Sequence, residues 1–540
     1  PFMQHGVDYA FRVDGKGPFP DPRSPWQPEG VHGPSRWLDH ARFAWTDERW
    51  QQPPLGSAVI YEMHVGTFTQ EGTFITAIDH LDDLVKLGIT HVELMPVAEF
   101  SGRRGWGYDG VDLYAPHHAY GEPEDLKRLV NACHERGMAV LIDVVYNHLG
   151  PEGNYLGNFG LYFTNTYSTF WGEAVNLDGP ESDKVRRFFI DNALMWLRDY
   201  HMDGLRIDAV HAIVDTSAIH FLEQLSAEVK SLEAELGRHL LLIAESDLND
   251  TRIIQPPELG GYGIDAQWNE DFHHALHAIL TAEQNGYYLD FGRIEDLVYI
   301  LTRGFLYDGR YSRYRRRSHG RPAAGLSGHR FVGCLQNHDQ VGNRAAGERI
   351  GHLISPELLK VGAALVMTAP FVPMIFQGEE WGASSPFQYF TNHQDVELGE
   401  AMWEGRQNEF AAFGWKPETV PDPQSEETFL RSKLDWDERS TSPHNDIMEW
   451  YRALIKLRRR FPELTDGRCR PSDMFFDEAA RWFIMIRGTV LVVCNFAEAE
   501  QRIPCPECMG KEIVVSSGEG CKVEKNIIVL PGSAAAVLVG

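Results

Sequence analysis

Long apolar runs are nearly absent from this sequence. The most apolar stretch, residues 361–376, is interrupted by Pro370 and Pro373 and is too short to cross a bilayer. Residues 1–23 lack the basic start and apolar run of a secretory signal. We therefore predict that the protein has no membrane partner. We interpret residues 361–376 as a helix followed by a buried strand.

Cysteine is also sparse, and it follows no paired pattern. Seven cysteines, an odd number, are scattered from Cys133 to Cys521. Cys505 and Cys508 have the spacing of half a zinc site, but no second pair and no nearby histidine completes it. We therefore predict reduced thiols, a cytoplasmic location, and neither a metal nor a cofactor.

Positive charge is in the minority. Fifty Lys and Arg against 77 Asp and Glu give a formal net charge of −27, which would repel nucleic acid over most of the surface. The basic stretch 314–317 stands alone, and we interpret it as a solvated or salt-bridged loop. A neutral ligand suits this balance. The 62 aromatic residues (14 Trp, 19 Tyr and 29 Phe) could stack on sugar rings or could simply fill cores.

Apolar strands alternate with amphipathic helices along most of the 540 residues. Helical periods occur at 75–87, 124–136, 183–200 and 221–236. Such alternation predicts an α/β fold with a parallel sheet, and eight strands favour a closed (β/α)8 TIM barrel over an open sheet. The predicted strands are 58–65, 91–97, 139–145, 204–210, 240–245, 265–268, 331–338 and 371–377.

Three parts are predicted. Residues 1–50 are rich in proline, glycine and tryptophan, and we interpret them as the remnant of an N-terminal β-sandwich-like domain that begins upstream, plus a linker. Residues 51–464 form the catalytic barrel, whose last helix spans 448–461. Residues 465–540 form an antiparallel β domain, with strands at 482–487, 489–494, 512–515 and 527–539.

The segment 149–180, after the third strand, is unusually long for a connection between a strand and its helix. It is rich in glycine, asparagine and aromatic residues. Loops of this length in a compact domain are usually functional, so a lid or a binding wall is expected. An ordinary insertion is the alternative.

The strand 204–210 carries two charged residues in an apolar setting. Arg206 and Asp208 are two positions apart, so both side chains project to the same side of the strand. A guanidinium beside a carboxylate keeps it ionised, as a nucleophile requires. An ordinary ion pair at the end of a strand is the alternative.

Other predicted strands end in similar chemistry. Asn147 and His148 end the third strand, Glu245 ends the fifth, and His338 and Asp339 end the seventh. The ends of parallel strands share one rim of a barrel, where active sites of this architecture lie. Carboxylates collected there fit glycosidic cleavage, in which one carboxylate attacks while another, with a raised pKa, donates a proton.

These strand ends carry a family resemblance. The segments 143–148, 204–211, 244–246 and 336–339 resemble the four shared segments of the α-amylase superfamily of retaining glycosidases. Over nearly the whole chain, further segments are similar to the malto-oligosyltrehalose trehalohydrolase family, which normally carries a complete N-terminal β domain. Glu270 stands where an aspartate is expected. The further segments are 61–68, 243–250, 268–277 and 377–383.

The resemblance implies roles for individual residues. Asp208 would be the nucleophile, Glu245 the general acid/base and Asp339 the transition-state stabiliser. Simple packing is the alternative for each of the others, and adjacent residues such as His273 and His274 on a helix cannot face one metal ion together. The expected substrate-binding residues are Tyr108, His148, Trp171, Arg206, His211, Glu270, Asp271, Phe272, His273, His274, His338, Gln340, Asn343 and Glu379.

The resemblance also implies a reaction. It is hydrolysis of the α-1,4 bond that joins a malto-oligosaccharide to a terminal trehalose, with malto-oligosyltrehalose or a related α-glucan as the partner. A glycogen branching or debranching enzyme shares the four segments and is the first alternative, against which the segment 269–277 argues. An inactive carbohydrate-binding barrel is the second, against which the three intact carboxylates argue.

Overall fold

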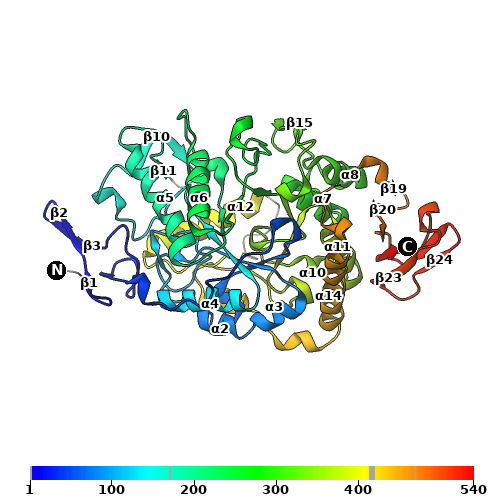
Figure 1. Ribbon diagram of the computed structural model, residues 1–540, viewed down its shortest axis with the longest axis horizontal. Helices are drawn as coiled ribbons and strands as arrows, with labels where there is room; N and C mark the ends of the chain where they lie inside the picture. Colours follow the sequence, from blue (N-terminus) through cyan, green and yellow to red (C-terminus); the bar gives the residue numbers. More distant parts are fainter. Residues whose placement is uncertain (1–2, 170–171, 413–419, 469) are drawn as a thin grey trace.

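A closed barrel of eight parallel strands forms the centre of the chain (Figure 1). The computed structural model describes residues 3–169, 172–412, 420–468 and 470–540. The last barrel strand pairs in parallel with the first, Met374 beside Ile60, which closes the barrel. The predicted (β/α)8 fold is confirmed. Its strands are β5 (Ile60–Met63), β6 (His91–Leu94), β9 (Ala139–Val144), β12 (Gly204–Ile207), β13 (Leu241–Ala244), β14 (Ala266–Trp268), β17 (Phe331–Cys334) and β18 (Val372–Phe376).

Helices surround the barrel where the apolar periods predict them, with one difference. The helix expected at 75–87 is two helices, separated at Asp79 and His80, and the His80 ring stacks on Trp436 with centroids 3.8 Å apart. Gly88, with a φ of 106°, ends the second of them. The covering helices include α2 (Phe74–Ile78), α3 (Leu81–Leu87), α4 (Pro123–Glu135), α5 (Ser182–Asp199), α6 (Phe221–Leu236), α7 (Glu270–Thr281), α8 (Ile294–Arg303), α11 (Pro356–Thr368) and α14 (His444–Arg460).

The long segment after the third strand has structure of its own. It contains an antiparallel hairpin of β10 (Phe163–Thr169) and β11 (Gly172–Val175), which lies beside α5 and α6 in Figure 1. The hairpin follows β9 at the end of the barrel where its strands terminate, so the segment belongs to the same rim as the predicted site.

Small antiparallel sheets occupy the two ends of the long axis (Figure 1). At the N-terminal end β1 (Asp8–Tyr9) pairs with β4 (Ser35–Arg36), and β2 (Phe11–Val13) pairs with β3 (Lys16–Phe19). The predicted strand at 527–539 is two strands, separated by Pro531, Gly532 and Ser533. The C-terminal strands are β19 (Met474–Asp477), β20 (Trp482–Arg487), β21 (Val490–Asn495), β26 (Ala534–Val539) and β23 (Glu512–Ser516) in one sheet, and β22 (Gln501–Pro504), β25 (Ile527–Leu530) and β24 (Lys522–Glu524) in another.

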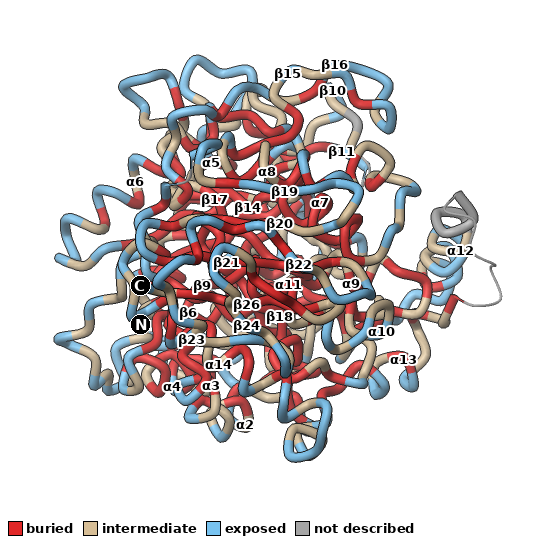
Figure 2. Tube along the Cα trace, turned by 90° about the vertical axis from the view of Figure 1, so that its right-hand side faces the viewer, coloured by how far each residue is buried: buried red, intermediate tan, exposed pale blue. Residues whose placement is uncertain are grey.

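Burial follows this organisation. The barrel strands run through the buried interior, and the exposed stretches are mainly outer loops and helix faces (Figure 2). None of the helices in the described parts is long and apolar enough to cross a membrane. The six cysteines that the structure describes are all free thiols, Cys505 and Cys508 among them.

A buried ion cluster joins the segment before the barrel to the barrel floor. The Nδ1 atom of His134 lies 2.7 Å from an Asp47 oxygen, and its Nε2 atom lies 2.9 Å from an Asp203 oxygen. All three side chains are at most 3% exposed. Burial alone would lower the pKa of His134, but the two carboxylates outweigh it and raise that pKa. The imidazolium therefore lies between two buried carboxylates and stabilises both.

Replacing His134 with alanine should lower the free energy of unfolding by about 3 kcal/mol, because it removes the cation that two buried carboxylates share and leaves only His201 beside Asp47 and Arg238 beside Asp203. Since the folded-state pKa of His134 is raised, its contribution is present at low pH and is lost as the pH rises through that pKa. Urea denaturation followed by circular dichroism measures the loss. The control is His239→Ala, which breaks an exposed pair with Glu233 and should cost about 0.5 kcal/mol at most. Equal losses in the two variants would contradict the account.

Candidate active site

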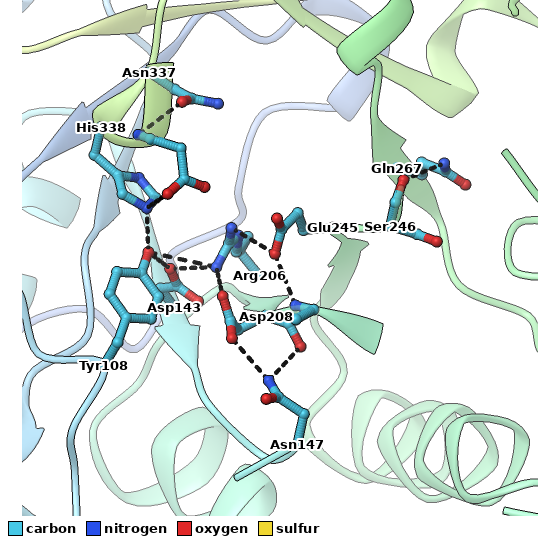
Figure 3. Close-up of polar contacts among 12 residues, drawn as sticks. Tyr108, Asp143, Asn147, Arg206, Asp208, Glu245, Ser246, Gln267, Asn337 and His338 are labelled. Atoms are coloured by element: carbon cyan, nitrogen blue, oxygen red, sulfur yellow. Dashed lines mark hydrogen bonds and ion pairs between the residues drawn. The ribbon is translucent and has the colours of Figure 1, made fainter. Parts of the chain in front are cut away.

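Arg206 on β12 is the centre of the site, and it holds three carboxylates (Figure 3). Its Nη1 atom donates to Asp208 at 2.8 Å and to Asp143 at 2.6 Å, and its Nη2 atom lies 3.1 Å from Glu245. The guanidinium lies over the Trp268 ring, 4.2 Å from its centroid. Arg206 is fully buried, so little water screens the interaction of its positive charge with the three carboxylates.

Asp208 is held in its ionised form. Besides the bond from Arg206, it accepts a 2.7 Å hydrogen bond from the side-chain nitrogen of Asn147. Burial raises its pKa, but the charges of Arg206 and then His148, with the Asn147 bond, outweigh burial and lower that pKa below its ordinary value. The side chain is still 11% exposed at the rim, so an ionised carboxylate faces the space where a substrate would lie.

Glu245 is held in the opposite state. Burial, with the charges of Asp208 and Asp339, raises its pKa well above its ordinary value despite the opposing charge of Arg206. The backbone N–H of Ala209 donates to its Oε2 atom at 2.7 Å. Ala209 has a φ of 37°, a left-handed turn directly after Asp208. The pKa values of these two neighbouring carboxyl groups are therefore displaced in opposite directions.

His338 links a third carboxylate to this pair. Its Nδ1 atom contacts Glu62, and its Nε2 atom lies 2.8 Å from the Tyr108 hydroxyl and 3.5 Å from Asp339. Burial lowers the pKa of His338, but the negative charges of Asp339 and Glu62 have a larger effect in the opposite direction and raise that pKa to about 9. The ring is therefore charged at neutral pH. Tyr108 donates in turn to Asp143 at 2.6 Å. A charged imidazolium thus stands beside the open Asp339 side chain, which is 34% exposed.

Asp339 is oriented by the start of a short helix, α9 (His338–Gly342). Asn337 precedes the helix, and its side chain accepts from the backbone N–H groups of Asp339 and Gln340. The Asn343 side chain donates to Asp339 at 3.3 Å. Asn343 therefore lies beside the third carboxylate and Gln340 follows it in the chain, while substrate binding by these two residues stays a prediction.

The first turns of α7 supply two more predicted residues. Glu270 and His274 are four positions apart and so share one helix face. Burial and then the charges of Asp247 and Asp339 raise the pKa of Glu270 to about 8, so this carboxyl group is mainly protonated at neutral pH. The His274 ring stacks on Tyr287 with centroids 4.9 Å apart. These contacts form a polar and aromatic wall beside Asp339.

The residues between them on α7 point elsewhere, because each step along a helix turns the side chain by about 100°. Asp271 accepts from the backbone of Tyr307 and its neighbour. Phe272 is fully buried edge-on against Phe371. His273 bonds the Leu335 backbone carbonyl. The structure places these three predicted contacts inside the protein, where they support the wall.

Three further predictions have different outcomes. Glu379 follows the carboxyl end of β18, is 1% exposed and accepts from the Tyr451 hydroxyl on α14, so its side chain is buried and its contact with the substrate stays a prediction. His211 is exposed, and its charge lowers the pKa of Asp247 beside the wall. Trp171 lies outside the described residues.

Sequence reasoning assigned no role to Glu62, Asp143 or Asn147, although all lay in quoted segments. Asp143 pairs in register with Arg206 across adjacent parallel strands, a relation that depends on register. Glu62 reaches His338 across most of the chain. Glu62 and Asp143 could have been noticed in the sequence because each is a charged residue inside an apolar strand, and a buried charge without a partner is uncommon.

Comparisons with known proteins agree with this geometry. The model of the α-amylase catalytic domain matches residues 40–176. A malto-oligosyltrehalose trehalohydrolase from Arthrobacter ramosus is 54% identical over 92% of this chain and 86% of its own length. One from Rhizobium sp. (strain M-11) is 48% identical over 98% of this chain and 89% of its own length. A crystal structure from Salmonella typhimurium, provisionally named an α-amylase, has a TM-score of 0.90 and 36% identity, covering 100% of this chain and 91% of that one.

Proposed function

The chain belongs to the malto-oligosyltrehalose trehalohydrolase family of α-amylase-type glycoside hydrolases, and from that membership we propose that its substrate is malto-oligosyltrehalose, cleaved at the α-1,4 bond next to the terminal trehalose. One observation carries the chemical part of the proposal. A single buried guanidinium contacts both Asp208 and Glu245, whose pKa values are displaced in opposite directions. Such a pair suits a reaction that needs a nucleophile and a proton donor at one bond.

The first step breaks the glycosidic bond. An ionised Asp208 oxygen attacks the anomeric carbon while protonated Glu245 gives its proton to the glycosidic oxygen, so that trehalose leaves as an alcohol. The products of the step are a glycosyl ester on Asp208 and an ionised Glu245. Arg206 stabilises the Glu245 carboxylate as it forms, since its Nη2 atom is 3.1 Å away.

The second step restores the enzyme. The Glu245 carboxylate takes a proton from water, the resulting hydroxide attacks the same anomeric carbon, and the ester bond to Asp208 breaks. Two inversions leave the configuration unchanged. Carboxylates that share one guanidinium form a close pair, which favours this route over the inverting one, whose carboxyl groups stand far enough apart to admit a water.

The remaining rim residues would grip the sugar. Asp339 and the charged His338 ring can hydrogen-bond ring hydroxyls, and Tyr108, stacked on His338, offers an aromatic face. Glu270 and His274 would line the neighbouring sugar position. A net charge of −27 is compatible with a neutral oligosaccharide.

Two parts of the proposal concern the whole chain. A cytoplasmic location is proposed because the six described cysteines are free. The division at about residues 50 and 464 is proposed because small antiparallel sheets lie on either side of the barrel.

Product analysis tests the substrate. The protein is incubated with malto-oligosyltrehalose and, in parallel, with maltopentaose, and the products are separated by chromatography. We expect free trehalose and one malto-oligosaccharide from the first, with far slower turnover of the second. Equal turnover of both, or new α-1,6 branches, would instead identify a general debranching or branching enzyme. Sugar binding without any turnover would identify an inactive barrel.

The pH profile of kcat/KM should be bell-shaped. Activity needs Asp208 ionised, and its pKa lies below the ordinary 3.8, so the acid limb should lie below about pH 4. Activity also needs Glu245 protonated, and its pKa is raised well above 4.5, so activity should persist through neutral pH and fall as the pH rises through that pKa. Arg206→Lys should raise the acid limb, because a lysine ammonium cannot reproduce the 2.8 Å contact of the Arg206 Nη1 atom with Asp208 together with the guanidinium contacts to Asp143 and Glu245. Activity that increases steadily from pH 5 to pH 9 would contradict these protonation states.

A further inference from the structure

A second cluster of ligating side chains lies beside the active-site loop. The short strand β7 (Ala98–Glu99) pairs with β8 (Asp112–Pro116), and His117 and His118 follow β8 directly. One ligand atom each from Glu99, His117 and His118 can be chosen so that all three lie within 4.8 Å of one another. Among the described residues, this is the one group of three histidine, cysteine or carboxylate side chains that meets this condition.

The spacing suits a small tetrahedral ion. Two ligand atoms each about 2.0 Å from a tetrahedral zinc ion stand about 3.3 Å apart. The His117 Nδ1 atom is 3.3 Å from one Glu99 oxygen. The His118 Nδ1 atom is 2.8 Å from the other, so this contact would open by about half an ångström, within the reach of side-chain rotation.

The His117 ring is buried without well-formed hydrogen bonds. Its side chain is fully buried, and neither of its ring nitrogens makes a hydrogen bond of good geometry, although the Nδ1 atom lies 3.3 Å from Glu99. The ring is clamped against Phe100, with centroids 3.7 Å apart and planes 15° apart. A buried imidazole without a bond, facing a carboxylate, requires an explanation.

Asp112, close to this cluster, also has a buried polar atom without a hydrogen-bond partner. It is the cross-strand partner of Glu99, and its Oδ2 atom is buried without a hydrogen-bond partner. Two buried carboxyl groups side by side are costly unless a positive charge lies near them.

We propose that Glu99, His117 and His118 bind one divalent transition-metal ion of the zinc class. Two imidazole nitrogens and one carboxylate oxygen are a ligand set that zinc accepts, with a fourth position left for water. The 17% exposed side chain of His118 gives that position access to solvent. The proposal does not depend on the substrate or on the glycosidic mechanism.

The ion would stabilise the conformation of the loop that carries Tyr108. The backbone N–H of His117 donates to the Val97 carbonyl, and Phe100, stacked on His117, packs against Gly105. The loop from residue 100 to 111 therefore begins directly after Glu99, and β8 leads from its end to His117 and His118. An ion bound there would fix the base of the loop whose tip contacts Asp143.

Metal content tests the proposal. The full chain is stripped with a chelator, incubated with excess ZnCl2, desalted, and analysed by elemental mass spectrometry; the same is done with CoCl2 and visible absorption. We expect about one tightly held ion per chain and the intense absorption of tetrahedral cobalt. Hydrogen exchange at residues 100–111 should slow when zinc is added. A wild-type chain that retains no ion overturns the proposal.

Variants locate the ion. His117→Gln, His118→Gln and Glu99→Gln should each lose at least about nine-tenths of the bound metal. The control replaces Cys505 and Cys508 with serine, removing the other zinc-like pair, and should keep the full content. His118 is the least buried ligand, so His118→Gln should fold even if the other variants do not, and its metal content then tests the assignment. Full metal content in His118→Gln, or its loss in the cysteine control, overturns the assignment.

Discussion

Replacing Asp208 with asparagine should lower kcat on malto-oligosyltrehalose by about 10⁴-fold, with little change in substrate affinity. The amide keeps the size of the carboxylate and can still bond Asn147, but it cannot attack an anomeric carbon. Steady-state kinetics measure the loss of kcat, and calorimetry with the intact substrate measures affinity. The nucleophile acts in the transition state, so kcat and kcat/KM should fall together.

The control for this variant is Asp265→Asn. It makes the same chemical change just before β14, at the opposite end of the barrel, where Asp265 accepts from the Leu242 backbone N–H. Its kcat should stay within a few-fold of wild type. If Asp208→Asn retains more than about a tenth of the activity, another group is the nucleophile. The reaction would then not require Arg206 to hold Asp208 ionised.

Replacing Glu245 with glutamine should lower kcat on malto-oligosyltrehalose by about 10³-fold, because a poor leaving group needs a proton. A malto-oligosyl fluoride needs none, since fluoride leaves without protonation. The variant should therefore react with the fluoride at nearly the wild-type rate in the first step, then stall for lack of a base in the second. A rapid fluoride burst followed by a slow steady state is the expected time course.

Two observations would contradict that assignment. If Glu245→Gln lost the fluoride reaction as completely as the natural one, Glu245 would be acting on binding or on the fold instead of on the leaving group. The matched control, Glu233→Gln, lies at the outer end of α6, where Glu233 caps the Leu240 backbone N–H. It should leave both reactions unchanged.

The sequence was sufficient to place two of the candidate catalytic carboxylates. Asp208 and Glu245 each follow the carboxyl end of a short, largely apolar strand, β12 or β13, so strand direction alone puts them on one rim. The Arg206–Asp208 contact followed from the two-residue alternation of a strand. Closure of the barrel was favoured by the strand count, but it depends on the pairing of Met374 with Ile60, which no local pattern encodes.

The contacts between distant segments could not be derived in the same way. Asp143 bonds Arg206 because β9 and β12 pair at one particular register, and a shift of one residue would turn Asp143 to the other face. Glu62 reaches His338 only because the barrel closes. On α7, a continuous segment was assigned to the substrate, but helical rotation sends Phe272 into the core. The break at His80 reflects its stacking on Trp436, a tertiary contact.

The central claim is that Asp208, held ionised by Arg206, carries the glycosyl group between the two steps. The most direct test is to incubate Glu245→Gln with a malto-oligosyl fluoride, digest the protein, and locate the added sugar mass by tandem mass spectrometry. We predict a glycosyl ester on Asp208, in the peptide that spans residues 204–211. An adduct on Asp339, or a stalled variant with no adduct at all, would contradict the account.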